Sequence, residues 1–260
     1  MTTETMPESL PEFLTVLGIP LSVIDSYESA LALIRRRIMD RRQTFCTAIN
    51  PAKIYLANRN PKLKGVLDAA HIHICDGVGA ALAAKLIHRR RVPRCTGIEL
   101  FLRLVDLSAR EGWKIFLLGA SPQSNGAARH KLIEAYPGLH VAGSRDGYFK
   151  DSAEIVAAIN NSGADLLFVA MGSPRQELWI GEHLPNLATR FCMGIGGSLD
   201  VVSGSVRWAP EICRKTGTEW LHRALVQPSR FPRLWTNGLF ALDVLAAVLA
   251  GQRKHLLTPR

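Results

Sequence analysis

The sequence predicts an α/β protein with a Rossmann-like, mostly parallel sheet, helices on both faces and a helical, basic C-terminal appendage. Short apolar segments alternate with helical patterns along roughly the first 200 residues, and this alternation is typical of parallel sheets covered on both sides. No repeat or low-complexity linker interrupts it, so we expect residues 1–204 to form one α/β core. The pattern changes after Gly204, and we expect residues 205–260 to form the appendage.

Seven apolar segments are the candidate strands, at residues 17–23, 44–49, 71–75, 114–118, 139–143, 165–170 and 190–193. Eight helical patterns separate or follow them, at residues 26–41, 52–57, 62–69, 79–90, 98–111, 123–136, 152–161 and 174–183. The carboxyl ends of parallel strands meet at one edge of the sheet, where open α/β proteins bind ligands. Polar residues that directly follow these strands are therefore candidate site residues.

After Gly204 the sequence predicts a helix over 210–224, a break at the segment QPSRFPR, and an apolar helix over 234–250. The last run has about 17 residues and contains Asp243, which is short of the roughly 20 apolar residues of a membrane span. Basic residues on both sides suit a helix that lies on anionic lipid headgroups. The alternative is a helix that packs on the core or on a sister subunit.

Composition indicates a cytoplasmic protein with a sizeable core, since 47% of the residues are hydrophobic and 21% are charged. The five cysteines are odd in number and form no CxxC pair, and the first dozen residues contain no signal-like apolar segment. We therefore expect buried thiols in a reducing compartment.

The net charge of +10 is concentrated in two places. Nine Lys or Arg residues but three acids lie in residues 207–260, and residues 85–94 contain five basic residues and no acid. Such runs attract the phosphates of a nucleotide, a lipid headgroup or a nucleic acid, although a solvated basic face is the simpler alternative.

Asp76 and Asn50 each follow a predicted strand. A carboxylate at a strand end can act as a general base on a hydroxyl group, but Asp-Gly is also a common turn dipeptide. Asn50 can hydrogen-bond a sugar or cap the helix that follows. On spacing alone, both interpretations remain for each residue.

The segment GSPRQE, residues 172–177, opens a helix after another predicted strand. Its unpaired N–H groups and the helix dipole favour an anion, and Arg175 and Gln176 add donors. The alternative is a capping sequence with no ligand.

Several familiar sites are excluded by their missing motifs. The sequence contains no GxxxxGK[ST] and no GxGxxG, which disfavours a P-loop ATPase and a regular NAD enzyme. It contains no Asp-x-Asp pair and no HExxH, and His71 and His73 lie in an apolar strand where core packing is expected. Without a metal site, a diphosphate leaving group would need fixed cations to balance its charge. Arg223, Arg230 and Arg233 suit that role because guanidinium groups match phosphate oxygens. The alternative is that these arginines form a solvated, membrane-facing patch.

Eight motifs in order resemble the WecG/TagA/CpsF glycosyltransferases, family 26, which build bacterial cell-surface polysaccharides. The motifs are TAIN, CDGVG, RCTGIEL, FLLG, GSRDGYF, VAMGSPRQE, GIGGSLDVVSG and RWAPEICRKTGTEWLHRALVQPSR, and the resemblance covers roughly residues 15 to 235. It implies an inverting transfer from a UDP-sugar to an undecaprenyl-diphosphate-linked acceptor at the inner face of the plasma membrane. It implies no metal and no other cofactor.

The resemblance also implies roles for individual residues. Asp76 takes the position of the general base. Asn50, Arg94 and Gln176 take the positions of the family's other catalytic residues, which lie around the donor sugar. Gly172 belongs to the wall of the donor site, Gly119 lies near the ribose, and Tyr148 and Asp200 contact the uracil. The diphosphate ligands fall on Arg223, Arg230 and Arg233.

One position departs from part of the family. Many members have Thr two residues before the Asn, where this chain has Ala48. With Ala48 and the segments DGYFK and AMGSPRQE, the chain most resembles the branch that transfers N-acetylmannosaminuronic acid. The N-acetylmannosamine transferases and the glucose or glucuronate transferases are close alternatives. Two alternatives from other functional classes are a basic nucleic-acid-binding module and a dehydrogenase. The sequence does not decide whether the protein forms a homo-oligomer.

Overall fold

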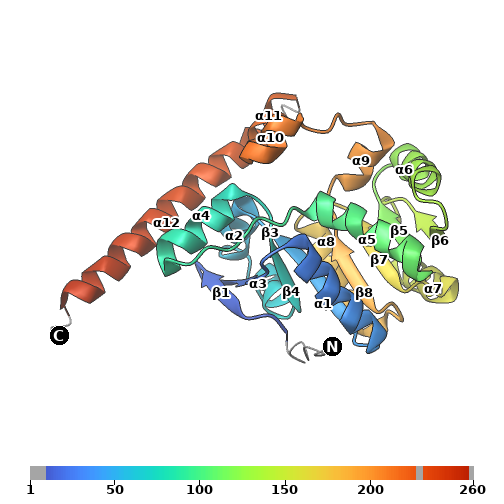
Figure 1. Cartoon of the computed structure of the whole chain (residues 1–260), viewed down its shortest axis with the longest axis horizontal. Coiled ribbons are helices and arrows are strands. Elements are labelled where there is room, and N and C mark those ends of the chain that lie inside the picture. The colour runs from blue at the N-terminus through green and yellow to red at the C-terminus, as the bar shows by residue number, and fades with distance from the viewer. Residues whose placement is uncertain (1–9, 227–230, 258–260) are drawn as a thin grey trace, which may run out of the picture.

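A computed structural model describes the backbone of residues 10–226 and 231–257, with the side chains of 223–225, 231–233 and 252–257 outside the description. Its centre is a sheet of six parallel strands in the order β4-β3-β8-β7-β5-β6 (Figure 1). The strands are β3 (Thr44–Ile49), β4 (Ile72–Cys75), β5 (Lys114–Gly119), β6 (His140–Arg145), β7 (Leu166–Ala170) and β8 (Phe191–Gly194). The predicted α/β class is confirmed.

The first predicted strand, at 17–23, does not join this sheet. Its residues form β2 (Ile19–Ser22), which pairs antiparallel with β1 (Phe13–Val16), a strand that the sequence analysis missed. Leu17 and Gly18 make the turn between them with positive φ angles of 51° and 77°. A two-residue turn of this kind joins antiparallel neighbours. The apolar residues at 17–23 therefore belong to a hairpin and not to a strand of the parallel sheet.

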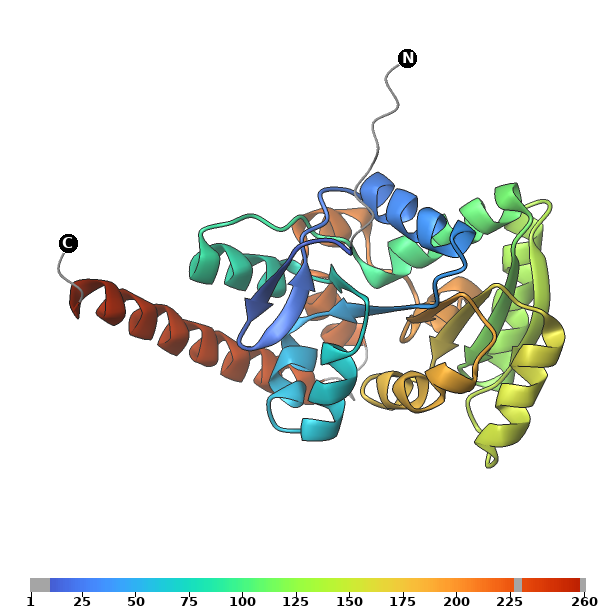
Figure 2. The ribbon, with the colours of Figure 1, turned by 90° about the horizontal axis from the view of Figure 1, so that it is seen from below.

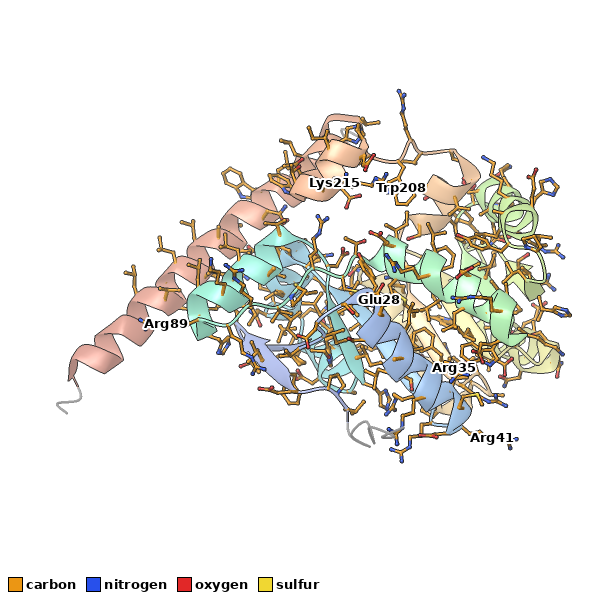
Figure 3. The ribbon with its side chains drawn as sticks, viewed as in Figure 1. Glu28, Arg35, Arg41, Arg89, Trp208 and Lys215 are labelled. Carbon is orange, nitrogen blue, oxygen red and sulfur yellow. The ribbon has the colours of Figure 1, made fainter. Side chains whose placement is uncertain are left out.

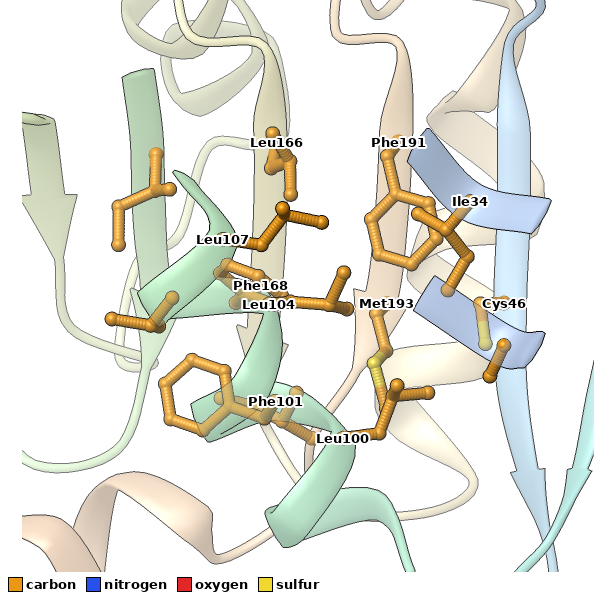
Figure 4. Close-up of a cluster of buried hydrophobic side chains, with 14 of the residues drawn as sticks. Ile34, Cys46, Leu100, Phe101, Leu104, Leu107, Leu166, Phe168, Phe191 and Met193 are labelled. Atoms are coloured by element: carbon orange, nitrogen blue, oxygen red, sulfur yellow. The ribbon is translucent and has the colours of Figure 1, made fainter. Parts of the chain in front are cut away.

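Helices cover both faces of the sheet, as Figures 1 and 2 show. Consecutive side chains of a strand point to opposite faces of the sheet. For this reason Phe168 lies in one core cluster and Leu167 in another, on the opposite face. The first cluster joins the sheet to α1 (Tyr27–Met39), α5 (Gly97–Glu111) and α6 (Pro122–Ala135), and the second joins it to α7 (Ser152–Ser162) and α8 (Arg175–His183). In Figure 4, Leu104 and Ile34 reach from α5 and α1 toward Phe168, Phe191 and Met193.

A third cluster lies at the β3–β4 end of the sheet. It contains side chains from the hairpin, from α2 (Pro51–Ala57), α3 (Pro61–Asp68) and α4 (Val78–His88), and from the C-terminal helix. His73 is buried in β4, as expected, with Nε2 2.7 Å from the carbonyl oxygen of Leu67, and burial lowers its pKa. The thiols of Cys46, Cys75, Cys95 and Cys192 are buried, whereas Cys213 is half-buried.

The C-terminal segment is helical, as predicted, but its boundaries differ. After α9 (Ser198–Ser203), the helix expected over 210–224 is two helices, α10 (Glu211–Thr216) and α11 (Glu219–Val226). Gly217 ends α10 with a left-handed φ of 76°, a conformation that stops a helix at little cost in glycine. The last helix, α12 (Phe231–Leu257), begins earlier and ends later than predicted.

Helix α12 runs beside α4 and projects past the body (Figure 1). Phe240 and Val244 bury its inner face in the third cluster, and 11% of the stretch Leu234–Gly251 is buried. By length and composition alone this stretch could cross a membrane, contrary to the sequence estimate. The division of the chain at Gly204 stays a prediction.

Candidate active site

One cavity of about 1330 Å³ opens at the carboxyl ends of β3, β4, β7 and β8. This exceeds the usual range of roughly 300–1,000 Å³ for a pocket that holds one small ligand. Six of the predicted site residues line it, namely Asn50, Asp76, Arg94, Gly172, Gln176 and Asp200. Residues from five separate segments of the chain therefore line one cavity.

Asn50 and Asp76 are neighbours because β3 and β4 are parallel and paired. Ile49 lies opposite Cys75, and the backbone N–H of Asp76 donates to the carbonyl of Ile49 at 2.8 Å. Asn50 also caps α2, since its Oδ1 accepts from the N–H of Lys53 at 3.0 Å. The capping interpretation of Asn50 is thus correct, and the same residue lines the cavity.

Gly97, at the start of α5, lies beside Asp76 in the cavity wall. A Cβ atom at Gly97 would lie 3.4 Å from the Cβ of Ala48 and 4.0 Å from Oδ2 of Asp76. Burial, and secondarily the charge of Asp76, raise the pKa of Cys75 and of Cys95 to about 12. Both thiols therefore stay protonated at neutral pH, whereas a carboxylate such as that of Asp76 is a group that can act as a base.

A buried ion pair, which the sequence analysis missed, fixes Gln176. Lys53 and Glu177 are 2% and 0% exposed, and Nζ of Lys53 lies 2.8 Å from Oε1 of Glu177. Nε2 of Gln176 donates to the same oxygen at 2.7 Å, and Oε1 of Gln176 accepts from the N–H of Gly196 at 2.9 Å. Lys53 also donates to Oγ1 of Thr47 at 3.1 Å, so the network ties the end of β3 to the start of α8.

Charge-assisted bonds between buried groups are strong and costly to break. The sequence signals were a lysine in the first turn after Asn50 and the Gln-Glu pair of GSPRQE. Neither indicates the other, because they are more than 120 residues apart and meet only through the parallel sheet.

Gln176 lies flat against the end of β8 because position 194 has no side chain. A Cβ atom at Gly194 would lie 2.5 Å from Nε2 and 2.9 Å from Cδ of Gln176. Gly172 turns the chain out of β7 with a φ of 76°, and the peptide bond from Ser173 to Pro174 is cis. The predicted helix start is confirmed within one residue, with α8 beginning at Arg175.

Arg94 connects the cavity to α10. Its Nη2 donates to the carbonyl of Arg214 at the end of α10, and a Cβ at Gly217 would lie 3.0 Å from Nη1 of Arg94. The guanidinium of Arg214 stacks over the ring of Trp208 at 4.4 Å, and Trp208 lies on the segment that leads to α10 (Figure 3). Arg94 therefore ties α10 to the cavity wall.

Neither Gly119 nor Tyr148 is among the described residues that line the cavity. The two lie near each other, since a Cβ at Gly147 would lie 3.3 Å from the Cα of Gly119. Tyr148 is 73% exposed. The predicted uracil contacts are thus divided between Asp200 in the cavity and an exposed loop beyond β6, and the proposed roles of these residues stay predictions.

The predicted diphosphate ligands lie outside the described residues or side chains. Arg230 falls in the segment that is not described, and only the backbone of Arg223 and Arg233 is described, in α11 and α12. Within the described part, no group of three His, Cys, Asp or Glu side chains is arranged to hold a metal ion.

Comparison with known proteins shows the family. A sequence profile of the glycosyl transferase WecG/TagA/CpsF family matches residues 14–254. The chain belongs to this family. It is 30% identical over 241 residues to an N-acetylglucosaminyldiphosphoundecaprenol N-acetyl-beta-D-mannosaminyltransferase from Bacillus spizizenii (strain ATCC 23059 / NRRL B-14472 / W23), an alignment that covers 91% of this chain and 94% of the relative. This WecG/TagA/CpsF protein is a glycosyltransferase, as the motifs had indicated.

Proposed function

We propose that this glycosyltransferase moves an N-acetylmannosamine-type sugar, either N-acetylmannosamine or its uronic acid, from a UDP-sugar to an N-acetylglucosaminyl-diphospho-polyprenol acceptor. The printed activity of the Bacillus relative supports the acceptor and the mannosaminyl class. The observation that carries the proposal is the cavity that Asp76 lines together with five other predicted site residues. Its volume has room for a donor and an acceptor head group together.

In the proposed reaction the Asp76 carboxylate removes the proton from an acceptor hydroxyl as that oxygen attacks the anomeric carbon. The new C–O bond forms on the face opposite the UDP, and the old bond to the diphosphate oxygen breaks with its electron pair leaving on UDP. Asn50, which is held by capping α2, and Gln176, which is held by the buried network, orient the donor sugar. This pre-organisation accelerates transfer because these two side chains need not be ordered during the reaction.

The departing diphosphate needs positive charge. Arg94 lines the cavity, and Arg223, Arg230 and Arg233 are proposed to complete the cation set without a metal. Gly172 forms part of the donor wall, Asp200 and Tyr148 contact the uracil, and Gly119 lies near the ribose in this proposal.

Helix α12 is proposed to contact the inner face of the plasma membrane. Trp235 is 76% exposed, Leu242 62% and Leu249 52%, and large exposed apolar side chains on one helix suit an interfacial position. The protein would then be a peripheral one that meets its lipid-linked acceptor at the bilayer surface.

The experiment is a transfer assay with purified full-length protein, UDP-N-acetylmannosamine or its uronic acid as donor and a short-chain N-acetylglucosaminyl-diphospho-prenol as acceptor. We expect a disaccharide product by mass spectrometry, with β configuration by NMR, and unchanged turnover in EDTA. UDP-glucose and UDP-glucuronate are the comparison donors, and a preference for either overturns the proposed sugar. Loss of turnover in EDTA overturns metal independence, and oligonucleotide binding without any transfer overturns the enzyme proposal.

A further inference from the structure

The cavity that contains Asp76 continues into an apolar groove between two helices. We call this part the α4–α12 groove. Its walls are apolar side chains of α4 and α12 that line the same cavity as the predicted site residues: Val78, Leu82, Leu86, Ala241, Leu245 and Val248.

The groove begins beside the proposed base. Asp76 is followed by Gly77, the N-cap of α4, so the first turn of α4 starts at the polar end of the cavity. Val78, Leu82 and Leu86 are four residues apart and share one face of α4. At 1.5 Å per residue this row extends the cavity by about 12 Å away from the strand ends.

Helix α12 supplies the facing wall. Ala241, Leu245 and Val248 are four and three residues apart, which places them on one face of this helix. The floor consists of Ala83, Phe240 and Val244, which are buried in the third core cluster. In Figure 1 the two helices run side by side away from the sheet.

The wall side chains are partly in solvent. Leu82 and Leu86 are each 50% exposed and Leu245 is 54% exposed. An apolar surface of this kind is left open to water at a cost in free energy and often marks a ligand site. Lys85 and His88 also belong to α4 but are not among the described residues that line the cavity.

We propose that the α4–α12 groove binds the first isoprenoid units of the acceptor's polyprenyl chain while the sugar diphosphate lies at Asp76. This inference rests on the proposed function. The acceptor is an amphiphile with a polar head and a hydrocarbon tail, and the cavity has the same order of polar end and apolar continuation. A bilayer surface or a second copy of the chain would also cover apolar side chains, but neither requires continuity with the catalytic end.

The test compares two water-soluble acceptors that differ only in the chain. One is N-acetylglucosaminyl diphosphate with a farnesyl chain, and the other has a methyl group in its place. The measured quantity is the ratio of kcat/KM for the farnesyl acceptor to kcat/KM for the methyl acceptor, without membranes. We expect a ratio well above one in the unaltered protein and about a tenfold smaller ratio in the double variant Leu82→Gln, Leu86→Gln.

The matched control is Ile133→Gln, which changes a similarly exposed apolar residue (43%) on α6. Its ratio should equal that of the unaltered protein. Circular dichroism checks folding, and if the double variant does not fold, Ala241→Trp tests the same groove by filling it from α12, with the same smaller ratio expected.

An unchanged ratio in a folded groove variant overturns the inference while transfer itself continues. If that variant instead loses co-sedimentation with acceptor-free anionic vesicles and keeps the ratio, the groove face is a membrane contact and the inference is wrong. Absence of transfer to both acceptors by the unaltered protein contradicts the proposed function, which separates the two failures.

Discussion

The two ends of the cavity are built in opposite ways. At the polar end, Lys53, Gln176 and Glu177 are at most 3% exposed and are joined by hydrogen bonds of 2.7 to 2.8 Å. At the apolar end, Leu82 and Leu245 are half exposed and lie on helices. At the polar end the pairing constrains the side chains, because a buried charge is costly to leave unpaired. An apolar groove is non-directional and accepts a flexible chain.

This contrast predicts that the polar end stabilises the fold, and the ion pair should show the largest effect. Lys53→Met leaves the Glu177 carboxylate buried without its cation, and Oε2 of Glu177 already has no hydrogen-bond partner in the described part. We expect a loss of about 3–5 kcal/mol in the free energy of unfolding, measured by urea denaturation.

The double variant Lys53→Met, Glu177→Gln is the control, because it removes both charges and keeps the shape. It should regain part of the lost stability, as expected for neutralising a broken buried pair. If Lys53→Met alone unfolds like the unaltered protein, the polar end is not held by this ion pair.

The second prediction concerns chemistry at the polar end. Asp76→Asn keeps the size of the side chain and removes its basicity, so kcat should fall about a hundredfold or more while donor affinity is largely retained. A fall of this size equals about 2.7 kcal/mol in transition-state stabilisation.

Asp106→Asn is the matched control for Asp76→Asn, since Asp106 lies on the surface of α5 and pairs there with Arg110. Its kcat should not change, because such exposed pairs contribute little. Equal kcat in Asp76→Asn and the unaltered protein, with saturating donor at neutral pH, would make Asp76 a turn residue.

The third prediction tests whether Gln176 must lie in its observed position. Gly194→Ala places a Cβ within 2.5 Å of Nε2 of Gln176 and pushes the amide off Glu177 and Gly196. Crowding of this kind costs about 1–3 kcal/mol, and we expect kcat/KM to fall about tenfold. Gly126→Ala is the control, since no neighbouring atom lies within 4 Å of the new Cβ there. If kcat/KM falls no more in Gly194→Ala than in this control, the position of Gln176 does not matter for the reaction.

The sequence predicted much of the polar end and little of the apolar one. Strand ends are local features, so Asn50, Asp76 and Gln176 could be placed at one sheet edge from periodicity and the parallel rule. The Lys53–Glu177 pair could not be found, because it depends on which strands become neighbours. The groove was missed for a related reason. The sequence pattern of α4 indicates an apolar helix, but it does not show that α12 packs beside α4 and leaves one face of α4 uncovered.

The smallest effect is expected at the apolar end, where the contrast is sharpest. Leu82→Ala removes a side chain that is 50% exposed and lines the cavity, whereas Leu67→Ala removes one that is fully buried in the third cluster. We expect a change below about 1 kcal/mol for Leu82→Ala, because half of that surface already meets water, and about 2–5 kcal/mol for Leu67→Ala. Urea denaturation of both variants decides the point: comparable losses would mean that Leu82 serves the core and that the groove is part of the packing. A clear difference would show that Leu82 gives α4 apolar surface that the fold does not need.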